Sequence, residues 1–134
     1  MAISKMQAEF TCDMAEIWNI VTSLENYSWR SDISRIVITE PGKQFEERTK
    51  DGYVTHFTIT ALEMYRRYEF DMDNENMSGH WTGIFSQCGN RVRIDFTEDV
   101  TAKKNIMKPF VKGYLKKQQQ KYIADLRRAL ENRQ

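Results

Sequence analysis

Histidines and carboxylates are the side chains of this chain that could carry proton transfer, and strand parity indicates where each of them points. His80 stands next to Trp81, and His56 stands next to Phe57, in segments whose apolar residues alternate. Successive side chains of a strand point to opposite faces, so an inward-facing ring puts the neighbouring histidine on the wet face. The sequence therefore favours surface positions for both histidines, although imidazole titrates near neutral pH and suits acid–base chemistry.

Two carboxylates fall on the apolar side of their strands. Glu47 shares a side with Phe45, and Glu98 shares a side with Phe96. Either could reach the mouth of an internal cavity and act there as a general acid or base. An unpaired buried carboxylate is costly, so a strand end suits them better than the interior. The sequence predicts no catalytic residue and keeps Glu47, Glu98 and His80 as minor candidates.

No pattern indicates a metal, a cofactor or covalent catalysis. The two cysteines, Cys12 and Cys88, form no metal-type pair and no disulfide framework. There is no Gly-x-Ser-x-Gly elbow and no Gly-rich phosphate loop. We therefore expect no metal and no cofactor. Enzymatic activity stays open, with a binding role favoured.

These side chains need elements to position them, and the most pronounced element is the last one. Residues 102–134 predict one long helix with an apolar face opposite a basic face. Pro109 must lie in the first turn or kink the helix, and Gly113 leaves room for either a ligand or a bulky neighbour. Gln118 lies within the apolar face, where it would bond either a ligand or a sheet carbonyl or water. The large residues of that face are Met107, Phe110, Val111, Tyr114, Leu115, Tyr122, Leu126, Ala129 and Leu130.

The preceding hundred residues predict a sheet. We expect a first strand at 4–10, a helix at 14–24 and, at 26–29, a short turn or second small helix. Strand-like segments follow, separated by turns: 33–39 is β-branched and apolar, 44–49 is its return strand, and apolar residues alternate in 53–62, 67–73, 77–87 and 91–100. This pattern is typical of a meandering antiparallel sheet. The predicted fold class is α+β, with about six to seven strands wrapped around the long terminal helix and two short helices after the first strand.

Composition and charge narrow the class of protein. A hydrophobic fraction of 40% and a charged fraction of 29% are ordinary for a soluble domain, so we expect one domain over residues 1–134. No apolar run is long enough for stable membrane insertion, and a reduced, cytoplasmic setting is the expectation. Residues 1–102 hold 10 Lys/Arg against 17 Asp/Glu, whereas residues 103–134 hold 10 against 2. We interpret the basic face as solvated and expect no nucleic acid, because no aromatic residues are interleaved with its lysines.

Three stretches resemble the START/Bet v 1-like helix-grip superfamily, in the branch called SRPBCC or polyketide cyclase/dehydratase-like proteins. Residues 15–22 resemble the opening helix of that family, residues 24–30 its aromatic turn, and residues 79–85 its late hairpin. The resemblance implies an incomplete barrel that grips the terminal helix around a cavity. Family members bind lipids, sterols, polyketides or other apolar molecules, and only some of them are enzymes.

With that fold, aromatic residues become candidates for a ligand pocket rather than for core alone. The candidate ligand-binding residues are Trp29, Phe45, Phe57, Tyr68, Phe70, Trp81, Phe85, Phe110, Tyr114 and Gln118. The favoured hypothesis is the binding of a hydrophobic or amphipathic small molecule, lipid or polyketide-like, in a cavity above about 300 Å3. The alternatives are a cyclase/dehydratase-type enzyme and a protein or membrane-surface adaptor that uses the basic helix face. The oligomeric state stays open.

Overall fold

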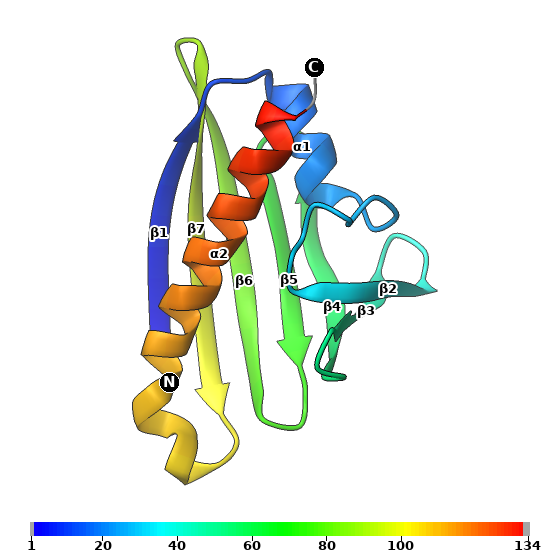
Figure 1. Cartoon of the computed structure of the whole chain (residues 1–134), viewed down its shortest axis with the longest axis vertical. Helices are drawn as coiled ribbons and strands as arrows, with labels where there is room; N and C mark the ends of the chain where they lie inside the picture. Colours follow the sequence, from blue (N-terminus) through cyan, green and yellow to red (C-terminus); the bar gives the residue numbers. More distant parts are fainter. Residues whose placement is uncertain (1, 133–134) are drawn as a thin grey trace.

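The computed structural model describes residues 2–132 and consists of one curved sheet with helices on its concave side (Figure 1). The strands are β1 (Ala2–Phe10), β2 (Ile33–Glu40), β3 (Gln44–Thr49), β4 (Val54–Glu63), β5 (Arg67–Asp73), β6 (Met77–Cys88) and β7 (Arg91–Ala102). Their order in the sheet is β1-β7-β6-β5-β4-β3-β2, and the paired neighbours run antiparallel. The predicted meander is confirmed, and each predicted strand is found with shifts of at most two residues at its ends.

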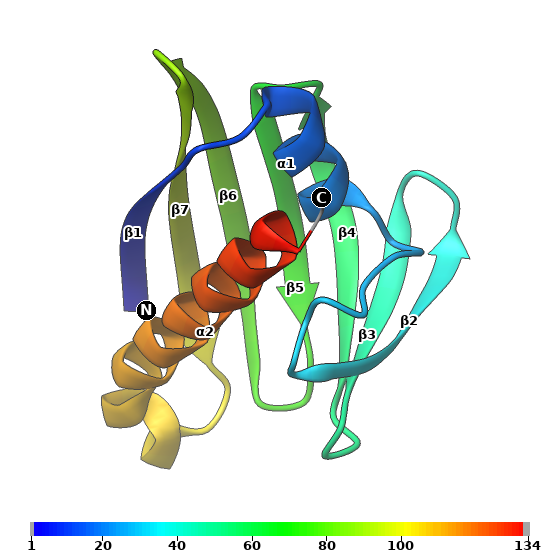
Figure 2. The same cartoon turned by 45° about the horizontal axis from the view of Figure 1, so that its top comes forward.

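Register shifts bend the sheet at its far edge. The pairing slips between Ile59 and Ala61 in β4, and at two places in β2. A bulge adds a residue to one strand, which bends it and increases its twist. Figure 2 shows the result: β2 and β3 curve forward, so that the sheet forms a trough.

The helix α1 (Met14–Thr22) closes one end of the trough and is the single α-helix between β1 and β2. The prediction of two short helices here was wrong. After Thr22 the chain turns, because the Ser23 hydroxyl accepts the backbone N–H of Asn26 at 3.0 Å and Ser23 itself is extended. Such side-chain bonds to the backbone compete with helix formation and favour turns.

The terminal helix α2 (Val111–Glu131) crosses the concave face diagonally (Figure 1). It starts later than predicted, because β7 runs to Ala102 and a 3-10 helix, η1 (Asn105–Phe110), contains Pro109. Proline has no N–H to bond the carbonyl four residues back, so the turn that contains Pro109 does not form part of the α-helix, which accounts for the delayed start. The predicted residues 133 and 134 of the helix lie outside the described part of the chain.

Two apolar clusters hold α2 against the sheet. The larger lies at the α1 end and includes Leu126 of α2, and the smaller includes Val111 and Leu115. The α2 residues between them are more polar. This stretch, around residues 118–122, therefore borders a part of the trough that apolar side chains do not fill.

Candidate functional site

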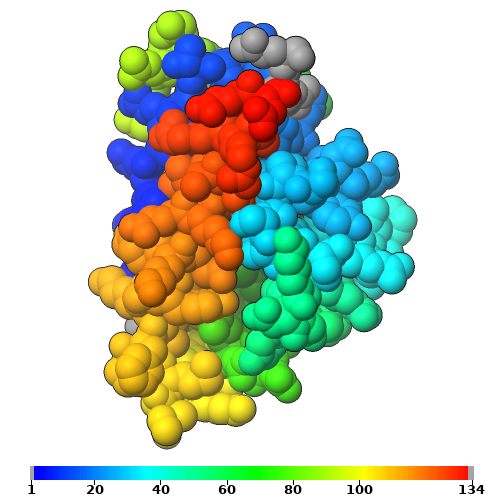
Figure 3. Space-filling model, viewed as in Figure 1, coloured from blue at the N-terminus to red at the C-terminus, as the bar shows by residue number. Residues whose placement is uncertain are grey.

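A cavity of about 190 Å3 lies between the concave face of the sheet and α2. Its walls come from β2 to β7, from α1 and α2, and from the segment between α1 and β2. Figure 3 shows the surface hollowed between α2 and the blue-green strands beside it, with the green of the sheet at the floor. Concave sites with apolar walls and a few polar groups are the usual form of small-molecule sites.

Eight of the ten predicted ligand-binding residues line this cavity: Trp29, Phe45, Phe57, Tyr68, Phe70, Trp81, Tyr114 and Gln118. The other two do not. Phe85 is buried beside Trp18 of α1, with the ring centroids 4.9 Å apart, because it lies further along β6, under α1. Phe110 is 71% exposed, because it ends η1 rather than continuing the apolar face of α2.

The aromatic walls are rigidly packed. Phe45 stacks on Phe57 with centroids 4.7 Å apart, and Phe70 stacks on Trp81 at 4.9 Å. Gly83 makes room for the Trp81 ring, since a Cβ on Gly83 would lie 2.5 Å from Cη2 of that ring. The sheet therefore presents two fixed ring stacks to the cavity.

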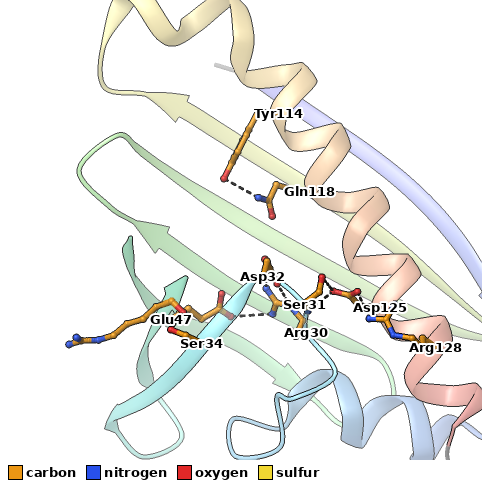
Figure 4. A network of polar contacts seen from close by, with 10 residues as sticks. Arg30, Ser31, Asp32, Ser34, Glu47, Tyr114, Gln118, Asp125 and Arg128 are labelled. Carbon is orange, nitrogen blue, oxygen red and sulfur yellow. Dashed lines mark hydrogen bonds and ion pairs between the residues drawn. The ribbon is translucent and has the colours of Figure 1, made fainter. Parts of the chain in front are cut away.

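One cation, Arg30, lies in the cavity wall and is held by two carboxylates (Figure 4). Arg30 donates from Nε and Nη2 to Asp32 at 3.2 and 3.3 Å, and from Nη1 to Glu47 at 3.4 Å. Its guanidinium also lies over the rings of Tyr122, at 5.1 Å, and Trp29, at 5.8 Å. Burial opposes the charge of Arg30, but Glu47 and Asp32 outweigh it and raise its pKa. Burial raises the pKa of Glu47, and Arg30 offsets part of that rise.

Sequence reasoning missed Arg30 and Asp32. Both belong to the irregular segment between α1 and β2, where neither helical nor strand period predicts direction. One signal was available in the sequence: Arg30 is the last residue of the stretch 24–30, which carries part of the family resemblance.

Glu98 is the other carboxylate in the cavity, and it has no hydrogen bond or ion pair with the described residues. Burial raises the pKa of Glu98 to about 7, with Arg30 lowering it and Glu47 raising it further. The indole Nε1 of Trp29, also in the cavity wall, is buried and has no partner among residues 2–132. The cavity thus contains one acceptor, Glu98, that the chain leaves unpaired, whereas the unpaired Trp29 N–H is buried within the wall.

Two neighbouring glutamines of α2 take the two positions that we considered for Gln118, one in the cavity and one at a carbonyl of the sheet. Gln118 lines the cavity and donates from Nε2 to the Tyr114 hydroxyl at 3.0 Å (Figure 4). Its neighbour Gln119 is the residue that reaches the sheet, donating to the Ser4 carbonyl at 3.0 Å and accepting from the Ser4 hydroxyl at 2.8 Å. Gly113 is exposed, and a Cβ there would meet nothing within 4 Å, so it makes room for neither a ligand nor a bulky neighbour.

A second polar contact attaches the segment that carries Arg30 to α2. Asp125 accepts the backbone N–H and the hydroxyl of Ser31, both at 2.9 Å, and Nη2 of Arg128 at 2.7 Å (Figure 4). Burial acts to raise the pKa of Asp125, but these bonds outweigh it and lower that pKa. Trp29, Arg30 and Asp32 are therefore positioned from α2 as well as from β2.

Both histidines lie outside the cavity, on the outer face that strand parity predicts. His80 contacts Glu69 through Nε2 and Asp71 through Nδ1, each at 2.7 Å, and His56 contacts Glu46 at 3.2 Å. Burial acts to lower the pKa of His80, but the hydrogen bonds to Asp71 and Glu69 outweigh it and raise that pKa. Of the four titratable candidates, Glu47 and Glu98 are the two that line the cavity.

Within residues 2–132, no group of three or more His, Cys, Asp and Glu side chains is arranged to hold a metal ion. The helices of this described part include none that is long and apolar enough to span a bilayer.

The comparisons with known proteins agree with this geometry. The family described as polyketide cyclase / dehydrase and lipid transport matches residues 1–131. A START superfamily protein from Mycobacterium smegmatis superposes with a TM-score of 0.88 at 14% identity, over 96% of this chain and 97% of that chain. A conserved protein from Geobacillus kaustophilus gives 0.83 at 8% identity, over 97% and 95%. The Aha1 dimer protein from Colwellia psychrerythraea gives 0.74 at 16%, over 98% and 98%.

No curated protein matches the chain. The solved structures share the fold at identities too low to carry a function across. They confirm the predicted α+β helix-grip fold. Since the family match spans nearly every residue, this chain belongs to the polyketide cyclase / dehydrase and lipid transport family.

Proposed function

We propose that this protein binds a small amphipathic molecule in the cavity between the sheet and α2. The observation that carries the proposal is the pairing of fixed aromatic walls with a carboxylate that the chain leaves unpaired, Glu98. Rings provide apolar contact area for a ligand, and the unpaired carboxylate orients its polar part. The family description, which includes lipid transport, supports an apolar component in the ligand.

The size of the cavity restricts the ligand. Its volume of about 190 Å3 is smaller than we expected from the sequence, and compares with about 300–1,000 Å3 for drug-sized ligands. It corresponds to about six water molecules at about 30 Å3 each. A ligand enclosed by this structure is therefore small, and a longer one would extend past Tyr114, which is 50% exposed.

Native mass spectrometry of the purified protein after incubation with lipid and polyketide-like extracts tests the proposal. The blocking variant is Gln118→Phe, which places a ring in the cavity wall, and its matched control is Gln120→Phe on the exposed face of α2. We expect a bound mass with the wild type and Gln120→Phe, and its loss with Gln118→Phe. Absence of any bound mass from the wild type, or equal binding by both variants, would contradict the proposal.

A second candidate function is acid–base catalysis of the cyclase/dehydratase kind. The observation that favours it is Glu98, a cavity carboxylate whose pKa is raised to about 7 and which can thus both give and take a proton near neutral pH. Its test is conversion of a retained ligand, measured as loss of one water by mass spectrometry. Catalysis predicts that Glu98→Gln still binds the ligand but no longer converts it. Retention of full turnover by Glu98→Gln would exclude Glu98 as the proton carrier.

A further inference from the structure

Building on the proposed function, we propose that the polar part of the ligand is a basic nitrogen, so that the cavity takes small aryl- or alkylamines as ammonium ions. The observation behind this is the sign of the charges in the cavity wall. They comprise one cation, Arg30, and three carboxylates, Asp32, Glu47 and Glu98. The lining residues include no lysine and no histidine. With all four groups ionised, the wall is anionic.

The one cation is already occupied. Arg30 bonds Asp32 through two nitrogens and Glu47 through a third, and it also lies over the rings of Tyr122 and Trp29. An anionic ligand would have to displace one of these carboxylates to reach Arg30. Breaking a buried ion pair leaves a charge without compensation, which is strongly unfavourable. The site therefore disfavours carboxylate and phosphate ligands.

Glu98 is the charge that a ligand can still pair. It stands directly across from Trp81 in the β6–β7 pairing and shares the inner face of β7 with Phe96. A carboxylate in an apolar wall attracts a cation through its charge, because the low local dielectric strengthens that attraction. An ammonium ion at this position would also compensate a buried charge that the protein leaves unpaired. The raised pKa of Glu98 is consistent with that missing partner.

Three probes of similar size and different charge test the inference: phenethylamine, phenethyl alcohol and hydrocinnamate. We expect calorimetry at about pH 8 to show the amine binding about tenfold more tightly than the alcohol, and the carboxylate binding weakest. In Glu98→Gln, the amine should lose this advantage while the alcohol keeps its affinity. Glu25→Gln is the matched control at an exposed position, and should behave as the wild type.

The wild type alone provides a second readout. An alkylammonium, like lysine, stays protonated between about pH 6 and 8. Protonation of Glu98 over that range should weaken amine binding about tenfold and leave alcohol binding unchanged. This measurement stands even if Glu98→Gln folds poorly.

The outcomes separate the inference from the proposed function. Equal affinity for amine and alcohol, or tighter binding of hydrocinnamate, overturns the amine assignment and leaves the cavity as a binding site. Amine binding that does not change with pH or with Glu98→Gln also overturns it. If none of the three probes binds at millimolar concentration, the amine assignment fails. The extract experiment with Gln118→Phe then decides the proposed function separately.

Discussion

A carboxylate buried without a cation in contact should make folding less favourable as it ionises. Glu98 lines the cavity as a half-buried group of this kind, and its partial burial raises its pKa from 4.5 to about 7. Between these values the folded state holds a proton that the unfolded state has released, so stability falls as pH rises. We predict that the wild type loses up to about 3 kcal/mol of unfolding free energy between about pH 4.5 and 7 from this group.

Urea unfolding of the wild type and Glu98→Gln across that range measures the effect. The variant has no carboxylate to ionise, so its stability should decline less and should exceed that of the wild type at pH 7.5. The exposed substitution Glu25→Gln is the control and should follow the wild-type profile. Parallel profiles for wild type and Glu98→Gln would show that Glu98 is compensated in the folded state.

Glycine has opposite consequences in two elements of this fold. Gly113 lies in α2 with open space around its missing Cβ, whereas Gly83 lies in β6 against the Trp81 ring. We predict that Gly113→Ala stabilises the protein by about 0.5–1 kcal/mol, because alanine loses less backbone entropy in a helix. Gly83→Ala should destabilise it by about 1–3 kcal/mol, since the stacked ring cannot move freely. Thermal unfolding of the two variants measures the sign of the stability change for each substitution. Stabilisation by Gly83→Ala would show that the Trp81 ring is loosely held.

The segment between α1 and β2 depends on α2 for its position. Asp125 is 3% exposed and accepts two hydrogen bonds from Ser31. We predict that Asp125→Ala lowers the unfolding free energy by about 1–3 kcal/mol, because buried donors lose their acceptor. The lowered pKa of Asp125 means that its contribution is present above the unfolded pKa of about 3.9 and is lost as pH falls through the folded value.

The control for that prediction is Arg128→Gln. Arg128 is the other partner of Asp125, and the Arg128 side chain is 55% exposed. A surface ion pair contributes under about 1 kcal/mol, so this variant should be nearly neutral. Urea unfolding near pH 7 compares the stabilities of Asp125→Ala and Arg128→Gln. Equal stability of the two variants would mean that the two hydrogen bonds from Ser31 to Asp125 contribute little to the free energy of unfolding.

Asp125→Ala should also weaken ligand binding, because Trp29, Arg30 and Asp32 are carried by the same segment.

Most elements of the fold could be predicted because their patterns are local. The later strands β4 to β7 alternate in sequence, and Gly42, Gly52 and Gly89 adopt the positive φ that their turns require. Parity also places Glu47 and Glu98 correctly on the inner face. The start of α2 was missed because apolar spacing continues through Pro109, although the backbone does not. Arg30 and Asp32 were missed because they lie in an irregular segment, where side chains do not alternate between two faces. The directions of these side chains are set by contacts with β3 and α2.

Across the whole molecule, positive charge is concentrated in the C-terminal segment that includes η1 and α2, and negative charge in the residues before it. Segments 1–102 and 103–134 carry −7 and +8. Two lysines of the basic segment contact the body, Lys103 at Asp73 and Lys116 at the Lys5 carbonyl. Lys112, Lys117 and Lys121 are exposed, without a hydrogen bond or ion pair to residues 2–132. The arrangement therefore favours a helix held by apolar contact rather than by attraction between opposite charges.

This distinction gives a prediction for the whole domain. Replacing Lys112, Lys117 and Lys121 together by glutamine should change the unfolding free energy by less than about 1 kcal/mol, since solvated charges are screened within about 10 Å in 0.1 M salt. Leu126→Ala should cost about 2–5 kcal/mol, because Leu126 is 0% exposed at the centre of the larger apolar cluster. Urea unfolding in low and high sodium chloride measures both. A triple variant that is strongly destabilised in low salt and recovers in high salt is incompatible with apolar anchoring. It would instead mean that the acidic sheet and the basic helix attract each other through charge.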